Sequence, residues 1–354
     1  MARNNPFHID GAPELTDEQK EKLGLEKQVA ALRGQLKASE ATARRYLEEA
    51  TRWEERFDTL AALREPVAPV LVPPGKSVFE RRGVALVNWS DWHVAEMVNP
   101  SMVQGRNSYS PEIAKKRAGN CSASTVGLWR YIRKSYHIDR LILFLGGDFI
   151  SGYLHPELEQ TNAMGPVEEA RFAEQLLLGA LEPLIAERSI GSIDLVMMRG
   201  NHGRTTKKIQ FKNDYKTSLE SWIYWHLADV LSSKRVRCRV PPGDVFLLPI
   251  TRDWSLRLFH GHQVRYQDGV GGVTIPLNKW EAKQDKTAPA QYNLMGHYHF
   301  YSQPNAFTTL NGSLKGWDEF AASIGAAFQP PLQTFALLDT ARRMVAQHLP
   351  IFCE

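Results

Sequence analysis

The sequence predicts an α/β fold in which two mixed sheets stack face to face with helices outside, as a four-layer αββα sandwich. Strand-like apolar runs alternate with helical segments early in the chain, strand-like runs dominate its second half, and a long heptad repeat precedes both. Alternation followed by a series of strands is typical of layered sheets that helices cover. The heptad repeat adds an N-terminal coiled-coil helix to this architecture.

Four regions are expected along the chain. They are a disordered lead at 1–14, a coiled-coil helix at 15–64, a proline-rich linker at 65–80 and a main domain at 81–354. The heptad positions step by four and three residues over five heptads, from Leu25 to Leu60. This strict repeat favours self-association through residues 25–60, a homo-oligomer of open chain number. The alternative is one amphipathic helix that packs back on the main domain.

Periodicity and turn residues place the elements of the main domain. Helices are predicted at 110–134, 166–188 and 215–231, the first with Ser110 as N-cap and Pro111 at the first helical position. The later strands are predicted near 236–240, 244–250, 254–260, 292–296, 306–310, 334–339 and 344–349.

Composition excludes some classes of protein. The chain has 354 residues, 43% of them hydrophobic, which is ample for one large domain with an accessory segment. The net charge of +4 is too small to indicate nucleic acid by itself. The cysteines, Cys121, Cys238 and Cys353, are odd in number and widely separated, as expected of reduced thiols in a cytoplasmic protein. No apolar leader and no membrane-spanning run is expected.

Five short segments end in residue types that bind metal ions. They are SDWH at 90–93, GGD at 146–148, GNH at 200–202, FHGH at 259–262 and GHYH at 296–299. Four of them follow a strand-like run, and residues just past strand ends point into a shared crevice in α/β folds. Carboxylate and amide oxygens with imidazole nitrogens suit Mn, Fe or Zn rather than a thiolate site. The segments together predict a two-metal centre.

This order of motifs resembles the calcineurin-like metallophosphoesterase superfamily over roughly residues 82–350. The resemblance implies the metallo-dependent phosphatase fold, a catalytic domain at 81–354, and two divalent ions, Mn²⁺ first, with Fe, Zn, Mg or Ni as alternatives. It implies one metal held by Asp91, His93, Asp148 and His299. It implies a second metal held by Asp148, Asn201, His260 and His297, with Asp148 bridging. His202 would contact the scissile phosphate and protonate the leaving oxygen.

The chain departs from the family pattern after GNH. Many members carry an acidic residue next, whereas this chain has Gly203. An acidic neighbour can orient a catalytic histidine and stabilise its charged form. The glycine therefore puts the protonation role of His202 in question unless another carboxylate approaches in space.

The motifs indicate the reaction more sharply than the substrate. GGDFISGYLHPE lacks the Asp-Arg pair of the protein serine/threonine phosphatase branch. His155 resembles the histidine that follows the GD motif in DNA-repair exonucleases, or it is an ordinary loop histidine. His262 is interpreted as a residue behind the ligands, as a substrate contact, or as an exposed side chain.

Basic residues gather around the third motif. The stretch GNHGRTTKK that contains the motif resembles the corresponding stretch of metallophosphoesterases encoded in bacteriophage genomes. The basic residues are Arg199, Arg204, Lys207, Lys208, Lys212 and Lys216. Such a run suits a polyanionic substrate, and Arg204, Lys207 and Lys208 join His155 and His262 as substrate-binding candidates. The nearby aromatic residues Phe211, Tyr215, Trp222 and Tyr224 favour a core role over base stacking.

These patterns predict a cytoplasmic dinuclear-metal phosphodiesterase, in a bacterial host cell if the gene is of phage origin. A DNA nuclease is the favoured function, with DNA as partner. One alternative is a phosphoesterase for nucleotides or cyclic nucleotides, with the basic run as a lid. Another is a non-catalytic scaffold that only binds nucleic acid.

Overall fold

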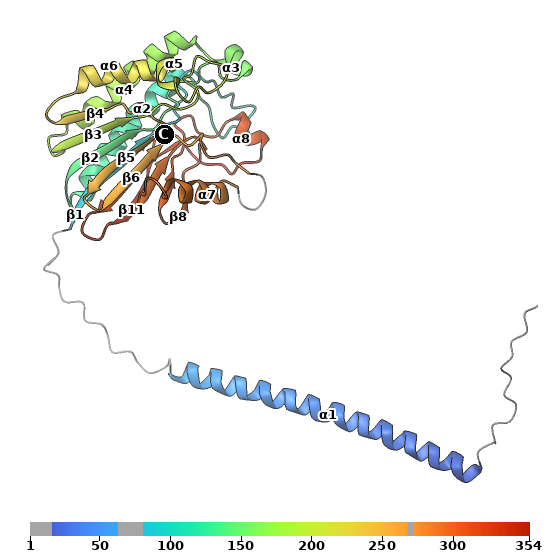
Figure 1. Ribbon diagram of the computed structural model, residues 1–354. Helices are drawn as coiled ribbons and strands as arrows, with labels where there is room; N and C mark the ends of the chain where they lie inside the picture. The colour runs from blue at the N-terminus through green and yellow to red at the C-terminus, as the bar shows by residue number, and fades with distance from the viewer. Residues whose placement is uncertain (1–15, 63–80, 268–271) are drawn as a thin grey trace, which may run out of the picture. The chain divides into compact units, whose positions relative to one another are not determined.

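The computed structural model describes residues 16–62, 81–267 and 272–354 (Figure 1). The chain forms two compact units, Met1–Lys76 and Ser77–Glu354. The lead predicted at 1–14 and the linker predicted at 65–80 lie outside the described residues. Among the described residues, no helix is both long and apolar enough to cross a membrane.

The first unit contains the helix α1 (Asp17–Ala62), close to the predicted span. Its apolar heptad side chains are largely open to solvent, with Leu32 62% and Leu36 60% exposed. A helix that buries none of its apolar stripe gains little stability from packing.

The first sheet of the second unit has the order β11-β10-β1-β2-β3-β4. Its strands are β1 (Arg82–Trp89), β2 (His137–Leu145), β3 (Ser192–Met197), β4 (Val236–Arg239), β10 (Leu332–Asp339) and β11 (Met344–Phe352). Strands β1 to β4 are mutually parallel, β10 pairs antiparallel with β1, and β11 pairs antiparallel with β10. The carboxyl ends of the four parallel strands therefore meet at one edge of the sheet.

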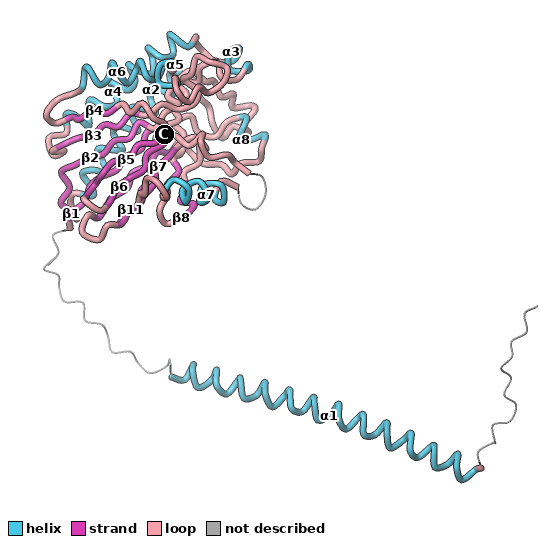
Figure 2. The backbone as a smooth tube through the Cα atoms, in the orientation of Figure 1, coloured by secondary structure: helices cyan, strands magenta, loops and turns pink. Residues whose placement is uncertain are grey.

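The second sheet has the order β5-β6-β7-β9-β8. Its strands are β5 (Val245–Thr251), β6 (Trp254–Phe259), β7 (Tyr292–Met295), β8 (Ser302–Asn305) and β9 (Thr308–Leu310). Strands β6, β7 and β9 are parallel, and the outer strands β5 and β8 are antiparallel to their neighbours. The predicted mixed α/β architecture with two mixed sheets is thus confirmed (Figure 2).

Seven helices accompany these sheets among the described residues of the second unit. They are α2 (Pro111–Ile132), α3 (Pro156–Thr161), α4 (Pro166–Ala186), α5 (Asp214–Thr217), α6 (Leu219–Leu231), α7 (Thr274–Gln284) and α8 (Glu319–Ser323). The predicted start of α2 is confirmed, since the Ser110 side chain accepts a hydrogen bond from the backbone N–H of Ile113. The single helix predicted at 215–231 is wrong, because extended backbone at Ser218 separates α5 from α6.

Three buried clusters show how the layers pack. Leu86 and Phe144 of the first sheet meet Leu258 and Leu294 of the second, so the two sheets pack face to face. The opposite face of the first sheet packs against α2, α4 and α6. A smaller cluster, which includes Leu277 of α7, joins that helix to the second sheet.

Candidate metal centre

The candidate ligands lie in short loops that follow β1, β2, β3, β6 and β7. Many of these loops use left-handed backbone, which non-glycine residues rarely adopt. Seven described non-glycine residues have positive φ, and five of them are candidate ligands: Asp91, His93, Asp148, His297 and His299. Such backbone costs energy that surrounding structure must offset, and it is concentrated at functional sites.

Glycines let these loops touch one another. A Cβ on Gly147, which has φ of +91°, would lie 2.2 Å from the backbone N of Gly200. A Cβ on Gly200 would lie 2.0 Å from Oδ1 of Asp148. The GGD and GNH motifs therefore need their glycines for close approach of two backbones.

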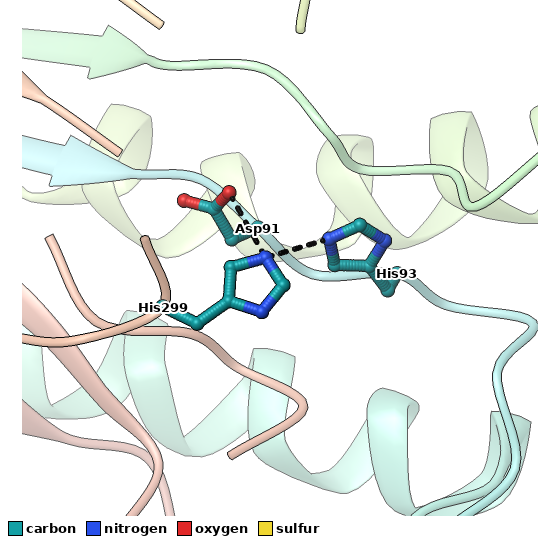
Figure 3. Close-up of side chains that lie close together, drawn as sticks. All are labelled: Asp91, His93 and His299. Atoms are coloured by element: carbon teal, nitrogen blue, oxygen red, sulfur yellow. Dashed lines mark hydrogen bonds and ion pairs between the residues drawn. The ribbon is translucent and has the colours of Figure 1, made fainter. Parts of the chain in front are cut away.

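A first group of possible ligands consists of Asp91, His93 and His299, whose ligand atoms lie within 4.8 Å of one another. Nε2 of His299 is 3.1 Å from Nε2 of His93 and 3.4 Å from Oδ1 of Asp91. Figure 3 shows the three side chains pointing toward one another. Asp91 and His93 are fully buried, and ionisable groups are rarely buried without a partner or a metal.

A second group consists of Asp148, His260 and His297. Nε2 of His260 lies 2.9 Å from Oδ2 of Asp148 and 3.2 Å from Oδ1 of Asn201. The structure thus brings together all the residues that the resemblance assigned to the second metal. Asp148 also forms a group with His93 and His202, so its carboxylate lies between the two sets.

The spacing of these atoms suits a shared cation. Ligands about 2.1 Å from one ion are about 3.0 Å apart at right angles and about 3.4 Å apart in a tetrahedron. The four distances given above run from 2.9 to 3.4 Å. In addition, Oδ2 of Asp148 is buried and lies 2.9 Å from Nε2 of His260.

Hydrogen bonds to the outer nitrogens aim the imidazoles at this centre. Nδ1 of His260 lies 2.7 Å from the carbonyl oxygen of Gly146. Nδ1 of His93 lies 3.1 Å from a carboxylate oxygen of Glu96. In both rings an Nδ1–H that donates to these oxygens leaves the Nε2 lone pair available to a metal.

Electrostatics couple Asp148 to the histidines. Burial opposes its charge, but His260 and His202 hold the pKa of the Asp148 carboxyl well below its usual range. Burial likewise opposes a charge on His260, yet the Asp148 carboxylate raises the pKa of that imidazole to about 10. Burial, with His260 adding to it, lowers the pKa of His297 to about 3. Without a metal, a proton on His260 neutralises the Asp148 carboxylate. A bound cation could replace that proton.

His202 lies beside the ligand groups, with its ring 4.8 Å from that of His93. Its Nδ1 is 2.9 Å from the carbonyl oxygen of Ser151, so a carbonyl orients the ring. Burial lowers the pKa of His202 to about 4. The imidazole is therefore neutral near pH 7, with Nδ1–H donated to Ser151 and Nε2 an acceptor.

The space at Gly203 is filled by a carboxylic side chain from α6. A Cβ at position 203 would lie 2.8 Å from Cγ of Glu220 and 2.9 Å from Oγ of Ser218. The Glu220 carboxylate accepts hydrogen bonds from the backbone N–H groups of Phe149 and Gly200. Glu220 therefore ties the GGD loop to the GNH loop through their backbones, and burial raises the pKa of its carboxyl group to about 8.

The predicted substrate-binding residues are placed differently. The exposed ring of His155 lies 5.7 Å from that of His202, centroid to centroid. His262 is 5.6 Å from His260 by the same measure, and its Nδ1 is buried without a hydrogen bond. Arg204 donates to the carbonyl oxygen of Asn201 at 2.8 Å. Lys207 and Lys208 are exposed.

The basic run is not uniform. Arg199 is buried and pairs with Asp214 at 2.6 Å and with Asp244 at 2.9 Å. Its charge is therefore neutralised inside the protein, and the interpretation of Arg199 as part of a substrate track is wrong. The core role favoured for the aromatics holds for Tyr224, which is 1% exposed, and fails for Phe211, which is 83% exposed.

Sequence reasoning missed the residues behind the ligands. Glu96 connects His93 to the buried Lys315, whose ammonium also contacts Asp318 at 2.6 Å. Glu169 is fully buried, and its carboxylate accepts hydrogen bonds from three backbone N–H groups, among them those of Ser151 and Gly152. Glu96 is three residues from His93 in the sequence. This short separation is the one local feature that could have pointed to a residue behind the ligands.

Comparisons with known proteins add little. No family model matches the chain, and no curated protein matches it. Among solved structures, the chain is similar to the crystal structure of a hypothetical protein from Pyrococcus horikoshii OT3. That similarity has 11% sequence identity and a TM-score of 0.36, and it covers 76% of this chain and 88% of that chain. At this level it carries no argument about fold or function.

Proposed function

We propose that the chain is a dinuclear-metal phosphodiesterase of the calcineurin-like metallophosphoesterase superfamily, with the metallo-dependent phosphatase fold, and that it acts as a DNA nuclease. The position of Asp148 supports this most directly. Its carboxylate belongs to ligand groups on both sides, with His93 and with His260. One carboxylate shared by two cations is the arrangement that two-metal hydrolysis of phosphoesters requires.

Each side of the site has a defined role in the proposal. Asp91, His93, Asp148 and His299 hold one cation, and Asp148, Asn201, His260 and His297 hold the other. Two divalent ions, with Mn²⁺ proposed first, would supply Lewis-acid activation of water and neutralise charge on the phosphoryl oxygens.

His202 handles the phosphate in this proposal. Its ring is held by the Ser151 carbonyl through Nδ1 and lies beside the ligand residues His93 and Asp148, which leaves Nε2 free to contact a bound phosphate. The negative charge of a bound phosphodiester raises the pKa of a nearby imidazole, because opposite charge favours the protonated form. His202 would then gain a proton as substrate binds and deliver it to the leaving oxygen.

The surroundings of the site favour DNA over a small phosphoester. His155, after β2, lies beside His202, and Arg204 and the exposed Lys207 and Lys208 follow the GNH motif after β3. Several cationic side chains in series suit a backbone with several phosphates. The exposed Phe211 lies in the same segment and offers a ring on which an unpaired base could stack.

The test is cleavage of labelled single- and double-stranded DNA and of bis-p-nitrophenyl phosphate in the presence of Mn²⁺. The wild-type chain is compared with Asp148→Asn, His202→Ala and a control, Lys134→Ala, an exposed cation just beyond the end of α2. We expect DNA cleavage that Asp148→Asn abolishes, and a loss of about 10²–10⁴-fold in His202→Ala with metal content retained. Lys134→Ala should cleave like the wild type.

Other outcomes would point to the alternatives. Turnover of the small diester alone would leave the metal centre in place and favour a nucleotide or cyclic-nucleotide phosphoesterase. Binding of DNA without turnover of either substrate would favour the non-catalytic scaffold. Binding that weakens steeply with salt would favour a nucleic-acid partner over a small one.

We further propose that α1 forms a coiled coil with copies of itself. Its exposed apolar stripe follows a seven-residue repeat, and apolar side chains of this kind are normally covered. An oligomer would place several sites along one DNA strand, which raises the effective concentration of the second site once the first is bound.

A further inference from the structure

A second charged site lies between the two sheets, apart from the metal centre. A cavity of about 280 Å³ is lined by residues of β2, β3, β4 and β5. They are Arg140, Asp194, Arg237, Arg239, Phe246, Leu248 and Pro249. Arg140 is five residues before the end of β2, so at about 3.3 Å per residue it lies about 17 Å upstream of the strand end that leads to Asp148.

Strand register explains why charged side chains gather there. Arg237 lies opposite Asp194 in the parallel pair of β3 and β4. Side chains alternate between the faces of a strand, so Asp194 shares a face with Val196, which packs between the two sheets. The residues between the two sheets are therefore apolar near the centre of the first sheet and charged near its edge strand β4.

Three guanidinium groups converge on one carboxylate. Asp194 is fully buried, and its Oδ2 accepts hydrogen bonds from Arg140 at 2.7 Å and Arg237 at 2.8 Å. Arg239 is 3.9 Å from Oδ1, beyond hydrogen-bond distance, and that oxygen accepts no hydrogen bond. Three positive charges less one negative charge leave an excess of two, and no second acidic side chain of the described residues lines the cavity.

A purely structural ion pair does not need this arrangement. One hydrogen-bonded arginine can compensate a buried carboxylate, and further cations close to it repel each other. The side chains of Arg237 and Arg239 are 49% and 45% exposed, so an ion can reach their remaining donors from solvent. Guanidinium forks match the geometry of phosphate oxygens.

We propose that this cavity binds a phosphate group carried by a nucleotide or by a nucleic-acid strand. Arg237 and Arg239 contact the phosphate, Arg140 holds Asp194 in place, and Phe246 and Leu248 form the apolar wall beside it. The proposal goes beyond the phosphodiesterase function and does not depend on it, since the cavity shares no residue with the metal centre.

The test is calorimetric titration of the full-length chain with AMP and, separately, with inorganic phosphate, each with Mn²⁺ and with a chelator. The double variant Arg237→Gln/Arg239→Gln removes the two exposed guanidinium groups. The matched control is Arg188→Gln, an exposed arginine outside the cavity. Loss of two charge-assisted hydrogen bonds should weaken AMP binding by about tenfold or more, whereas the control should bind like the wild type.

The chelator separates the two sites. The proposal expects AMP binding that persists in chelator and in Asp148→Asn. It is overturned if AMP binds only with Mn²⁺, or if the double variant binds like the wild type while its circular dichroism and melting temperature show an intact fold. A single-stranded oligonucleotide identifies the source of the phosphate. Weaker DNA binding by the double variant assigns it to a strand, and an effect on AMP alone assigns it to a free nucleotide.

Discussion

Asp148 combines three unfavourable features: left-handed backbone, a buried side chain and an ionisable carboxyl group. Its backbone is left-handed, with φ of 55°, and its side chain is 1% exposed. Left-handed backbone and a buried charge each lower the stability of the fold when no ligand is bound. They occur together where a bound cation would offset them, and the same combination at Asp91 and His93 strengthens that interpretation.

Glu96 offers a test at the residue scale that leaves every proposed ligand in place. Glu96→Gln removes the charge that faces Nδ1 of His93. We expect metal affinity to fall by about 10–100-fold, the usual effect of losing a partner that orients a ligand. Competition with a fluorescent chelator measures it, with Glu182→Gln, an exposed residue of α4, as the control. Equal affinities in both variants would contradict the role of Glu96.

Gly203 provides a second test at this scale. Because a Cβ there would lie 2.8 Å from Cγ of the buried Glu220, Gly203→Ala must displace a side chain that holds two loops. We expect a loss of about 1–3 kcal/mol in the free energy of unfolding, as for other overpacked sites. Urea denaturation measures it. Gly179→Ala is the control, because a Cβ at that helical position meets nothing within 4 Å. A neutral Gly203→Ala would show that the Glu220 link is loose.

The sequence predicted the candidate ligand residues better than the residues that hold the ligand loops in place. The motif residues are adjacent to strand ends, so their convergence follows from the topology of parallel strands. Glu220 is 71 residues from Phe149, whose backbone N–H it binds. Nothing in local pattern marks such a contact, because a buried carboxylate on an amphipathic helix has the same sequence signature as an exposed one.

At the scale of elements, local signals predicted boundaries where a side chain acts on its own backbone. Ser110 and Pro111 predicted the start of α2, since both act within the first turn. The break at Ser218 was missed because it arises from contacts across the chain, such as the hydrogen bond from the N–H of Leu219 to the carbonyl oxygen of Gly203. The short elements α3, α8 and β8 carry too few residues for a periodic pattern. Helix α7 has 11 residues, but its buried residues Pro276, Leu277 and Glu281 do not form an apolar stripe.

The N-cap of α2 can be tested directly. Ser110→Ala removes the side-chain acceptor for the N–H of Ile113, a hydrogen bond of 3.4 Å. We expect the free energy of unfolding to fall by about 0.5–1 kcal/mol, the lower part of the range for N-caps, because this bond is long. Chemical denaturation measures it against Ser135→Ala, an exposed serine beyond the end of the helix. No difference between the two would contradict the capping role.

For the whole molecule, the main prediction concerns self-association through α1. Leu32→Glu/Leu36→Glu places charges in the proposed seam, where they would be buried against another helix. We expect the full-length chain to be an oligomer and this variant to be a monomer by light scattering after gel filtration. Ala31→Glu, on the outward side of the same heptad, should leave the oligomer intact. A monomeric wild-type chain would favour the interpretation as a single amphipathic helix.

The most direct test of the dinuclear centre is the metal content of the purified, Mn²⁺-reconstituted chain, measured by elemental analysis together with electron paramagnetic resonance. We predict two Mn²⁺ per chain with the signal of a spin-coupled pair, because Asp148 would bridge ions about 3.5–4 Å apart. Asp148→Asn should lose the coupled signal and at least one ion. A wild-type chain that binds one ion or none, or a coupled pair that survives Asp148→Asn, would contradict the account.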